Sequence, residues 1–254
     1  MTILFSIGYF LQSLLSGRED LIRFNKLLSW SSRLNQHAVE DYLKTIYLLE
    51  QNESPVRTSR IAEARQVRPA SATNMLKRLY ERDLVNYRKH YGVTLTEEGL
   101  AVALEMLRHH RLLELYLTQE LGFGWDEVHE EADALEHVIS EKLEERIASL
   151  LDYPQFDPHG KPIPTKDGTV TKVDCQPLTQ LTEGDSGIVS YIGDDTNSEL
   201  LRYLARLGLL PGMDIQVTNV ALFDGTITAQ VNNEQIVVGH KAAANVYIKK
   251  AVGD

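Results

Sequence analysis

The sequence has little of what marks a secreted or membrane protein. Its 254 residues include one cysteine, Cys175, so neither an internal disulfide framework nor a cysteine-rich zinc site can form. The apolar stretch at residues 3–15 is shorter than the roughly 18 to 20 residues of a membrane span. It also lacks a basic leading region and a small-residue cleavage site. We therefore predict a cytoplasmic protein without membrane association and interpret residues 1–34 as an amphipathic N-terminal extension.

Basic charge is scarce overall, but it is concentrated in one segment. The net charge of −10 argues at first against nucleic acid, because phosphate binding requires basic side chains. Residues 57–90, however, carry nine basic groups against three acidic ones, which leaves −16 on the rest of the chain. A compact basic segment on an acidic body is typical of a DNA-reading module joined to a part that attracts cations.

Enzyme signatures are missing as well. The sequence contains no nucleophile motif, no glycine-rich phosphate loop and no His-Glu-x-x-His run. We therefore predict that the protein is not an enzyme. A metalloenzyme that activates water through its acidic residues is the less favoured alternative.

Residues 35–98 show the pattern of a winged helix-turn-helix. Apolar positions recur at helical spacing over residues 39–49, and a short helix follows with Thr58 or Ser59 as its predicted N-cap. After a turn at residues 66–69, a second helix is predicted from Pro69 or Ala70 to about Arg82. Two β-like stretches, 84–87 and 93–96, flank a basic tip, which predicts a hairpin.

The second of these helices is the predicted recognition helix. Its first turn is small and polar, so Ser71, Thr73 and Asn74 are predicted to reach base edges in the major groove. Basic side chains around it are predicted to bind phosphates, which gives affinity but little sequence information. They are Arg57, Arg60, Arg68, Lys77, Arg78, Arg88 and Lys89.

Residues 99–152 are predicted to form a helical domain. One long amphipathic helix runs from Glu97 to about Leu121, and after a glycine break another is predicted from Asp126 or Glu127 to Leu151. Their surplus of apolar residues favours a subunit interface, so we expect a homodimer. The next segment, 153–177, is proline-rich and is predicted to be a linker with little regular structure.

The last part of the chain, residues 178–254, changes to β-like texture. Runs at 186–192, 214–220, 226–231 and 245–248 are separated by turns, and one helix is expected at about 198–207. This pattern predicts a small β-barrel. The predicted fold is therefore mainly α with a β C-terminal domain.

Carboxylates and histidines recur at helical spacing in the central domain. Asp133, Glu136 and His137 are spaced i, i+3, i+4, with His129 one turn earlier, and other candidates lie on the preceding helices. These are the i, i+4 pair His110 and Glu114, and the single carboxylate Asp41. Spacing alone leaves two interpretations open, metal ligands or exposed helix charges. As ligands, oxygen and imidazole favour manganese(II) or iron(II), without excluding zinc.

The order of these motifs resembles the diphtheria toxin repressor family of metal-dependent regulators, specifically its manganese-transport-regulator branch. The resemblance covers about residues 35–254. It rests on Glu40–Tyr47, the helix-turn-helix through Asn74, Tyr91–Thr96, His110–Glu114, Val128–Ala132 with Glu136–His137, and Pro158–Pro164.

The resemblance implies two metal sites. The primary site would use Asp41, Asp133, Glu136 and His137, and the second would use His110, Glu114 and His129. The C-terminal domain is similar to the SH3-like, ferrous-transport-accessory-type domain of longer members. Such a domain can lend ligands to the second site, and Glu199 and Asn197 are the candidates here.

Three positions bear on the metal. Iron-sensing relatives have a thioether at the position of Asp41 and a cysteine at that of Asp133, so carboxylates here favour Mn²⁺ over Fe²⁺, with Zn²⁺ possible in vitro. The manganese branch often has a second carboxylate where Lys44 stands, which argues against a binuclear cluster of that type.

The function implied by the resemblance is that of a metal-dependent repressor. A manganese-responsive homodimer would bind double-stranded operator DNA and control metal-uptake genes, with an iron(II)-responsive repressor of the same family as the alternative. A winged-helix regulator of non-metal ligands is a less favoured possibility.

Overall fold

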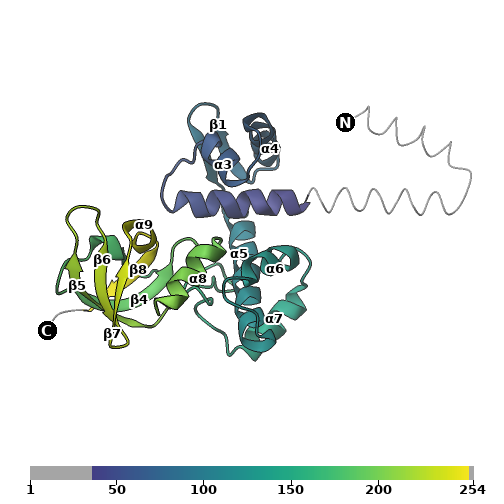
Figure 1. The fold of residues 1–254 in the computed structure, drawn as a ribbon. Coiled ribbons are helices and arrows are strands. Elements are labelled where there is room, and N and C mark those ends of the chain that lie inside the picture. Colours follow the sequence, from purple (N-terminus) through teal and green to yellow (C-terminus); the bar gives the residue numbers. More distant parts are fainter. Residues whose placement is uncertain (1–35, 252–254) are drawn as a thin grey trace, which may run out of the picture. The chain divides into compact units, whose positions relative to one another are not determined.

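The computed structural model describes residues 36–251 and shows two compact units, one ending at Ala103 and the other beginning at Leu104 (Figure 1). The boundary falls inside helix α5 (Glu97–Leu121), which has the bounds expected from the sequence. The extension predicted at residues 1–34 lies outside the described residues. Within residues 36–251, no helix combines the length and apolarity needed to cross a membrane.

The first unit is a winged helix-turn-helix. A helix over residues 36–50 precedes α3 (Thr58–Ala64) and α4 (Pro69–Glu81), and the wing consists of β1 (Val85–Arg88) paired antiparallel with β2 (Gly92–Leu95). The helical spacing of apolar residues predicted this core, and the structure confirms it. The fully buried side chains are Leu43, Ile46, Ile61, Leu76 and Leu79. Pro69 stands in the first turn of α4, where its missing N–H costs nothing.

The predicted N-cap of α3, Thr58 or Ser59, was wrong by one or two residues. Its N-cap is Arg57, in extended conformation and without a side-chain cap, so Thr58 is already helical. Arg57 instead pairs its guanidinium with Glu53, 3.2 Å away.

The helical part of the second unit differs from the prediction in one important respect. The helix expected from Asp126 or Glu127 to Leu151 is two helices, α6 (Val128–Leu135) and α7 (Glu141–Leu150). The break has a local cause, because the Ser140 hydroxyl accepts a hydrogen bond from the backbone N–H of Leu143 and caps α7. Glu136 therefore lies at the C-cap of α6 and His137 in the following turn.

The C-terminal module is a six-stranded antiparallel sheet with helix α8 (Ser198–Arg206), as the sequence led us to expect for the fold class. The strand order is β3-β8-β4-β5-β6-β7. Their bounds are β3 Gln176–Pro177, β4 Ser186–Ile192, β5 Asp214–Val220, β6 Ile227–Val231, β7 Glu234–Val238 and β8 Val246–Lys250. Two short helical segments, η1 (Leu178–Gln180) and α9 (His240–Ala243), complete it.

Strand β7 was not predicted, although its signal is present. β6 and β7 are joined by Asn232 and Asn233, both with positive φ, and Val231 pairs with Glu234. Two asparagines with positive φ form a tight two-residue hairpin turn. The polar start of β7 at Glu234 and Gln235 concealed the strand.

The proline-rich segment is irregular, as predicted, but it is not a free linker. Within residues 153–175 there is no helix or extended strand, only an isolated bridge between Phe156 and Pro162. Guanidinium groups on α5 nevertheless hold it, since Arg108 donates to the Pro164 carbonyl at 2.8 Å and Arg111 donates to that of Pro162. The segment is therefore a packed part of the second unit.

Candidate metal centre and DNA-binding surface

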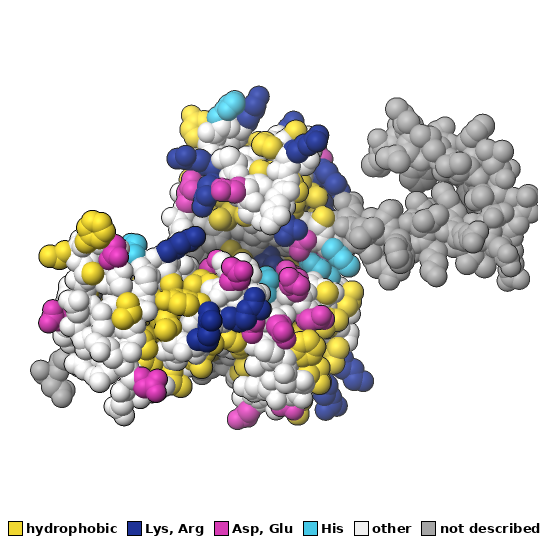
Figure 2. Space-filling view, in the orientation of Figure 1, with side chains coloured by type: hydrophobic (Ala, Val, Ile, Leu, Met, Phe, Trp, Pro, Cys, Tyr) yellow, Lys and Arg dark blue, Asp and Glu magenta, His cyan; other side chains and the backbone are white. Residues whose placement is uncertain are grey.

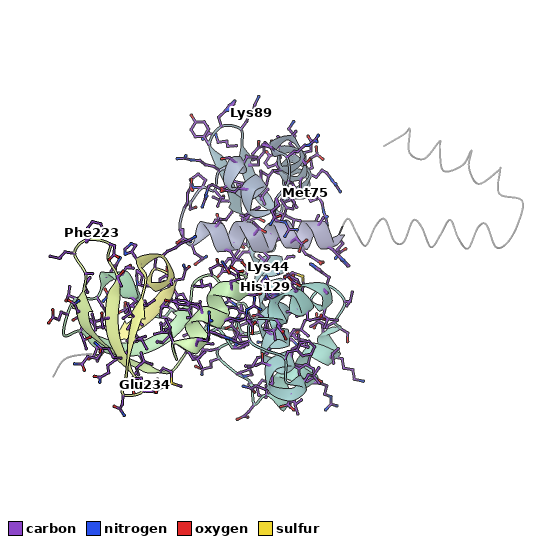
Figure 3. The ribbon with its side chains drawn as sticks, in the orientation of Figure 1. Lys44, Met75, Lys89, His129, Phe223 and Glu234 are labelled. Atoms are coloured by element: carbon purple, nitrogen blue, oxygen red, sulfur yellow. The ribbon has the colours of Figure 1, made fainter. Side chains whose placement is uncertain are left out.

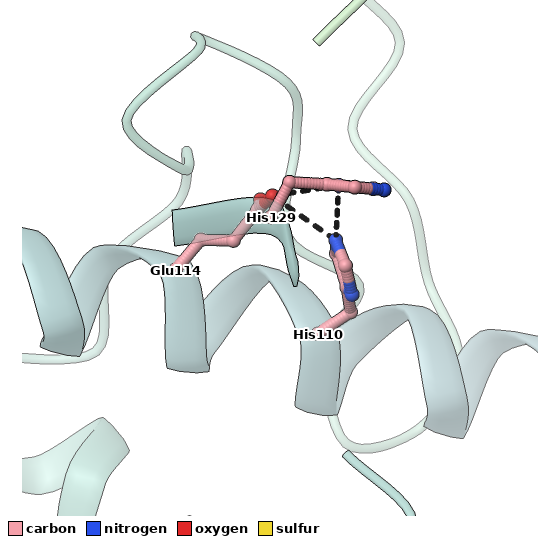
Figure 4. Close-up of side chains that lie close together, drawn as sticks. All are labelled: His110, Glu114 and His129. Carbon is pink, nitrogen blue, oxygen red and sulfur yellow. Dashed lines mark hydrogen bonds and ion pairs between the residues drawn. The ribbon is translucent and has the colours of Figure 1, made fainter. Parts of the chain in front are cut away.

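His110, on α5, is the centre of a histidine cluster formed with Glu114, His129, Asp133 and Glu136. Its Nε2 lies 3.0 Å from Glu114 Oε1 and 3.1 Å from His129 Nδ1 (Figure 4). Glu114 follows one turn later on α5, as the i, i+4 spacing predicted, and His129 comes from α6. Two imidazoles and a buried carboxylate thus converge within hydrogen-bond distance.

The other ring nitrogen of His110 faces the end of α6. His110 Nδ1 lies 2.6 Å from Glu136 Oε2 and 3.2 Å from Asp133 Oδ1. Next to them, His137 Nε2 lies 3.5 Å from Glu136 Oε1. Asp133 and Glu136 of the implied primary site and Glu114 and His129 of the implied second site therefore all lie around the His110 imidazole. His137 contacts Glu136 of this group.

Electrostatics in the histidine cluster favour charged groups in spite of burial. Burial alone would lower the pKa of His110, but Glu114, Asp133 and Glu136 outweigh it and raise that pKa well above its usual value. Burial would raise the pKa of Glu114, yet His110, His129 and His159 hold it well below its usual value. The carboxylates of this cluster thus favour the protonated form of His110, and metal binding at its imidazole would release that proton.

A second cluster, formed by Glu114, Asp157, His159 and Asp195, shares Glu114 with the first. Their potential ligand atoms lie within 4.8 Å of one another. Among the described residues, Glu114 Oε2, Asp157 Oδ2 and His159 Nδ1 are buried without a hydrogen-bond partner. Their nearest charged neighbours are at ion-pair distance only, with His159 Nδ1 3.7 Å from Glu114 Oε2 and Arg111 Nε 3.4 Å from Asp157 Oδ2. Buried polar atoms are nearly always hydrogen-bonded, so three potential ligand atoms that lack hydrogen bonds and lie close together indicate a place for a cation.

His159 is held in the orientation that a metal ligand needs. Its Nε2–H donates to the Trp125 carbonyl at 2.7 Å, and the two rings stack with centroids 5.6 Å apart. Because that bond occupies Nε2, the lone pair of Nδ1 points toward Glu114 in the neutral tautomer, as in metal-binding histidines. Burial opposes protonation of His159, but Glu114, Asp157 and Asp195 raise its pKa.

A glycine brings this turn close to the C-terminal sheet. Gly160 has a φ of +83°, and a Cβ there would lie 2.1 Å from the Ser190 carbonyl oxygen. The adjacent Ile192 N–H donates to the His159 carbonyl at 2.9 Å. The turn therefore requires glycine, and β4 fixes the backbone of His159.

Sequence reasoning missed three of these four residues. His159 appeared only within the resembling motif, and Asp157 and Asp195 were not singled out. Of the C-terminal candidates, Asn197 accepts a hydrogen bond from the Leu200 N–H and caps α8, whereas Asp195 reaches the cluster. The available signal was the Asp-x-His spacing at Asp157 and His159 in a segment interpreted as a linker.

In the first unit, the predicted metal ligand Asp41 pairs its carboxylate with Arg65 at 2.7 Å. The predicted DNA-contacting residues lie on the surface of α3, α4 and the wing, where Figure 2 shows dark blue side chains. Ser71, Asn74 and Lys77 are exposed on α4, and Lys89 extends from the wing (Figure 3). The remaining predicted basic contacts, Arg57, Arg60, Arg68, Arg78 and Arg88, are exposed as well.

Two of the predicted contacts are engaged locally. The Thr73 hydroxyl donates to the Pro69 carbonyl at 2.9 Å within α4, and Arg60 pairs with Glu63 at 2.8 Å. Exposed pairs of this kind contribute about 0 to 1 kcal/mol, so Arg60 can exchange its carboxylate partner for a phosphate.

The donor set of both clusters fits a divalent first-row cation. Carboxylate oxygens and imidazole nitrogens make up every candidate ligand, without a thiolate or thioether. Such ligands suit manganese, iron and zinc.

Comparison with known proteins gives a consistent result over the described chain. Family models match residues 36–93 (iron dependent repressor, N-terminal DNA binding domain), 96–165 (iron dependent repressor, metal binding and dimerisation domain) and 176–250 (FeoA domain). The iron-dependent repressor IdeR of Mycobacterium tuberculosis is 30% identical over 223 residues, covering 83% of this chain and 96% of the relative.

Solved structures agree with these matches. A manganese-dependent transcriptional repressor in complex with manganese superposes with a TM-score of 0.78 at 37% identity, covering 84% of this chain and all of that one. ScaR with bound Zn²⁺ gives a TM-score of 0.71 at 35% identity, covering 84% and 99%. The family is one of DNA-binding transcriptional repressors and not of enzymes, which confirms the prediction that this chain is not an enzyme. The chain belongs to the iron-dependent repressor family typified by the diphtheria toxin repressor, and it is a metal-dependent transcriptional repressor with DNA-binding, metal-binding and dimerisation, and FeoA domains.

Proposed function

We propose that this repressor responds to manganese(II) and, when loaded, binds the operators of metal-uptake genes as a homodimer. The observation that carries the proposal is the set of buried potential ligand atoms on Glu114, Asp157 and His159 that have no hydrogen-bond partner, beside the histidine cluster. Burying such polar atoms without hydrogen bonds costs folding free energy, unless a cation binds them.

The choice of manganese rests on the ligand types. Asp133 supplies a carboxylate at the end of α6, and the other candidates supply only oxygen and imidazole. Hard oxygen ligands suit manganese better than the softer ligands that select copper(I). The relatives named above include both iron-dependent and manganese-dependent repressors, so iron(II) is the alternative effector and zinc an in vitro substitute.

The proposed ligands form two sites. Asp133, Glu136 and His137 with His110 would hold the primary ion, and Asp41 is assigned to this site from the sequence resemblance alone. The second ion would bind Glu114 with Asp157, His159 and Asp195, and His129 lies beside it, 3.3 Å from Glu114 Oε1. A bound ion would supply positive charge in place of the proton on His110, whose pKa the surrounding carboxylates raise well above its usual value.

Metal binding would act on DNA through thermodynamic coupling. If the loaded form presents both recognition helices of a dimer at the right separation, about 34 Å for successive major grooves, then metal raises DNA affinity. By reciprocity, DNA raises metal affinity by the same factor, typically 5- to 150-fold.

Operator binding tests the proposal directly. Fluorescence anisotropy of the full chain on the DNA upstream of its own metal-transport genes would be measured at fixed salt with excess Mn²⁺, Fe²⁺, Zn²⁺ or chelator. Fixed salt matters because phosphate contacts dominate affinity. We expect the tightest binding with Mn²⁺ at concentrations that leave Zn²⁺ less effective.

Two results would contradict it. Equal affinity with chelator and with Mn²⁺ would remove metal-dependent repression. A stronger response to Fe²⁺ at equal free-ion concentration would replace manganese by the alternative effector.

A further inference from the structure

The second cluster contains a positively charged side chain, the ammonium group of Lys161. Lys161 Nζ lies 2.7 Å from Asp195 Oδ2, and the side chains are only 17% and 14% exposed. Lys161 comes from the proline-rich segment and Asp195 from the loop between β4 and α8. Among the described residues, Asp195 is the carboxylate that the C-terminal module contributes to this cluster. Lys161 therefore occupies the carboxylate oxygen of Asp195 that a bound metal ion would need as a ligand.

The charges around the cluster show what Lys161 does there. The Lys161 ammonium pairs with the Asp195 carboxylate although both side chains are largely buried. Asp157 has a different cation, because Arg111 Nε lies 3.4 Å from Asp157 Oδ2. Two resident cations thus offset the three carboxylates in the absence of metal.

Only one of the two cations can leave easily. Arg111 is fixed because its side chain is 8% exposed and also donates to the Pro162 carbonyl. Within the described part of the chain, the Lys161 ammonium pairs with Asp195 alone, and a lysine stem can carry its ammonium a few ångströms out to water. An arriving divalent ion repels the ammonium at the same oxygen.

We propose that Lys161 competes with the metal for Asp195 and thereby sets the metal concentration at which the second cluster fills. The inference rests on the proposed function, in which this cluster is a metal site, and goes further by assigning a threshold to one residue. When the metal ion displaces Lys161, the Asp195 carboxylate would bind the ion instead of the ammonium. The C-terminal module would therefore contribute a ligand only above the metal concentration that Lys161 sets.

The test is Mn²⁺ titration of the full chain by calorimetry, with stoichiometry from elemental analysis after gel filtration. Lys161→Met keeps the length of the stem and removes the charge, and Lys161→Gln is a second neutral variant in case the first folds poorly. Lys166→Met is the matched control, because Lys166 lies in the same segment and its side chain is 62% exposed. Thermal unfolding of each apo variant checks the fold.

We expect both neutral Lys161 variants to bind the second ion about tenfold more tightly than the wild type, toward the low end of typical couplings, with the first ion and the Lys166 variant unchanged. Unchanged or weaker binding of the second ion would overturn the role of Lys161. If neither wild type nor variants bind a second ion, the metal-site assignment itself fails, and the role of Lys161 fails with it. Asp195→Asn must remove the gain in the Lys161→Met background.

Discussion

The two units of this repressor use ionisable residues in opposite ways. In the DNA-binding unit, Arg57, Arg60 and Lys77 are exposed, and the first two pair with Glu53 and Glu63, whose side chains are 39% and 72% exposed. In the second unit, Glu114 and His110 are almost fully buried and contact each other, and Glu114 belongs to both clusters. The first arrangement makes each side chain nearly independent of its neighbours, whereas the second makes every substitution affect several ligands. Substitutions in the two units should therefore differ in size and in additivity.

Glu114→Gln should have the largest effect, because Glu114 contributes to both clusters. Even the loss of a supporting hydrogen bond costs about 10- to 100-fold in metal affinity. Loss of the shared carboxylate should therefore cost at least about 100-fold at each cluster, which would be measured as Mn²⁺ affinity by calorimetry. Glu120→Gln, exposed on the same helix, is the matched control. Loss of only one ion in the Glu114 variant would show that the clusters are independent.

Arg111→Met should have the next largest effect, on the stability of the metal-free protein. It removes the cation beside buried Asp157 and the donor to the Pro162 carbonyl. Breaking a buried pair by removing one partner costs roughly 3 to 5 kcal/mol, measured by urea unfolding in chelator. Excess Mn²⁺ should restore part of the loss, because the ion replaces the missing charge on Asp157.

Arg146→Met, exposed on α7, provides the comparison for that measurement. It should change the free energy of unfolding by less than about 0.5 kcal/mol, as surface substitutions usually do. A similar loss in both variants would mean that the Arg111–Asp157 pair contributes no more than an exposed side chain.

The same contrast explains what could be predicted from the sequence. Helical spacing predicted α4 and α5 closely, and alternation predicted β4 and β5, because these patterns depend on residues a few positions apart. Residues of the candidate metal centre were predicted from the sequence only where they too follow local spacing, as His110 and Glu114 do. Asp157 and Asp195 could not be found this way, because folding alone brings them to Glu114 from irregular segments.

The break after α6 was missed for a related reason. Residues 126–151 have an apolar pattern compatible with one helix, and the cap at Ser140 is a single weak signal within it. As a result the spacing of Asp133, Glu136 and His137 suggested one helical face, whereas Glu136 and His137 lie at and beyond the helix end.

The smallest expected effects are on DNA binding, where two exposed α4 side chains should behave differently. Asn74→Ala should cost about 1 to 3 kcal/mol of discrimination between bases at one operator position, with unfolding unchanged because Asn74 is exposed. Lys77→Ala should weaken binding equally on all sequences and reduce the salt slope by about one. Anisotropy titrations on the operator and on its single-base variants, at several salt concentrations, measure both effects.

The double variant Asn74→Ala/Lys77→Ala tests whether exposed residues of the DNA-binding unit act independently. If exposed residues act independently, its loss of operator affinity should equal the product of the two single losses within about a factor of two. An equal loss of affinity on every sequence after Asn74→Ala would show that Asn74 binds phosphate and does not read a base. Strong non-additivity would mean that this surface is coupled as tightly as the metal centre, and the distinction drawn between the two units would then be wrong.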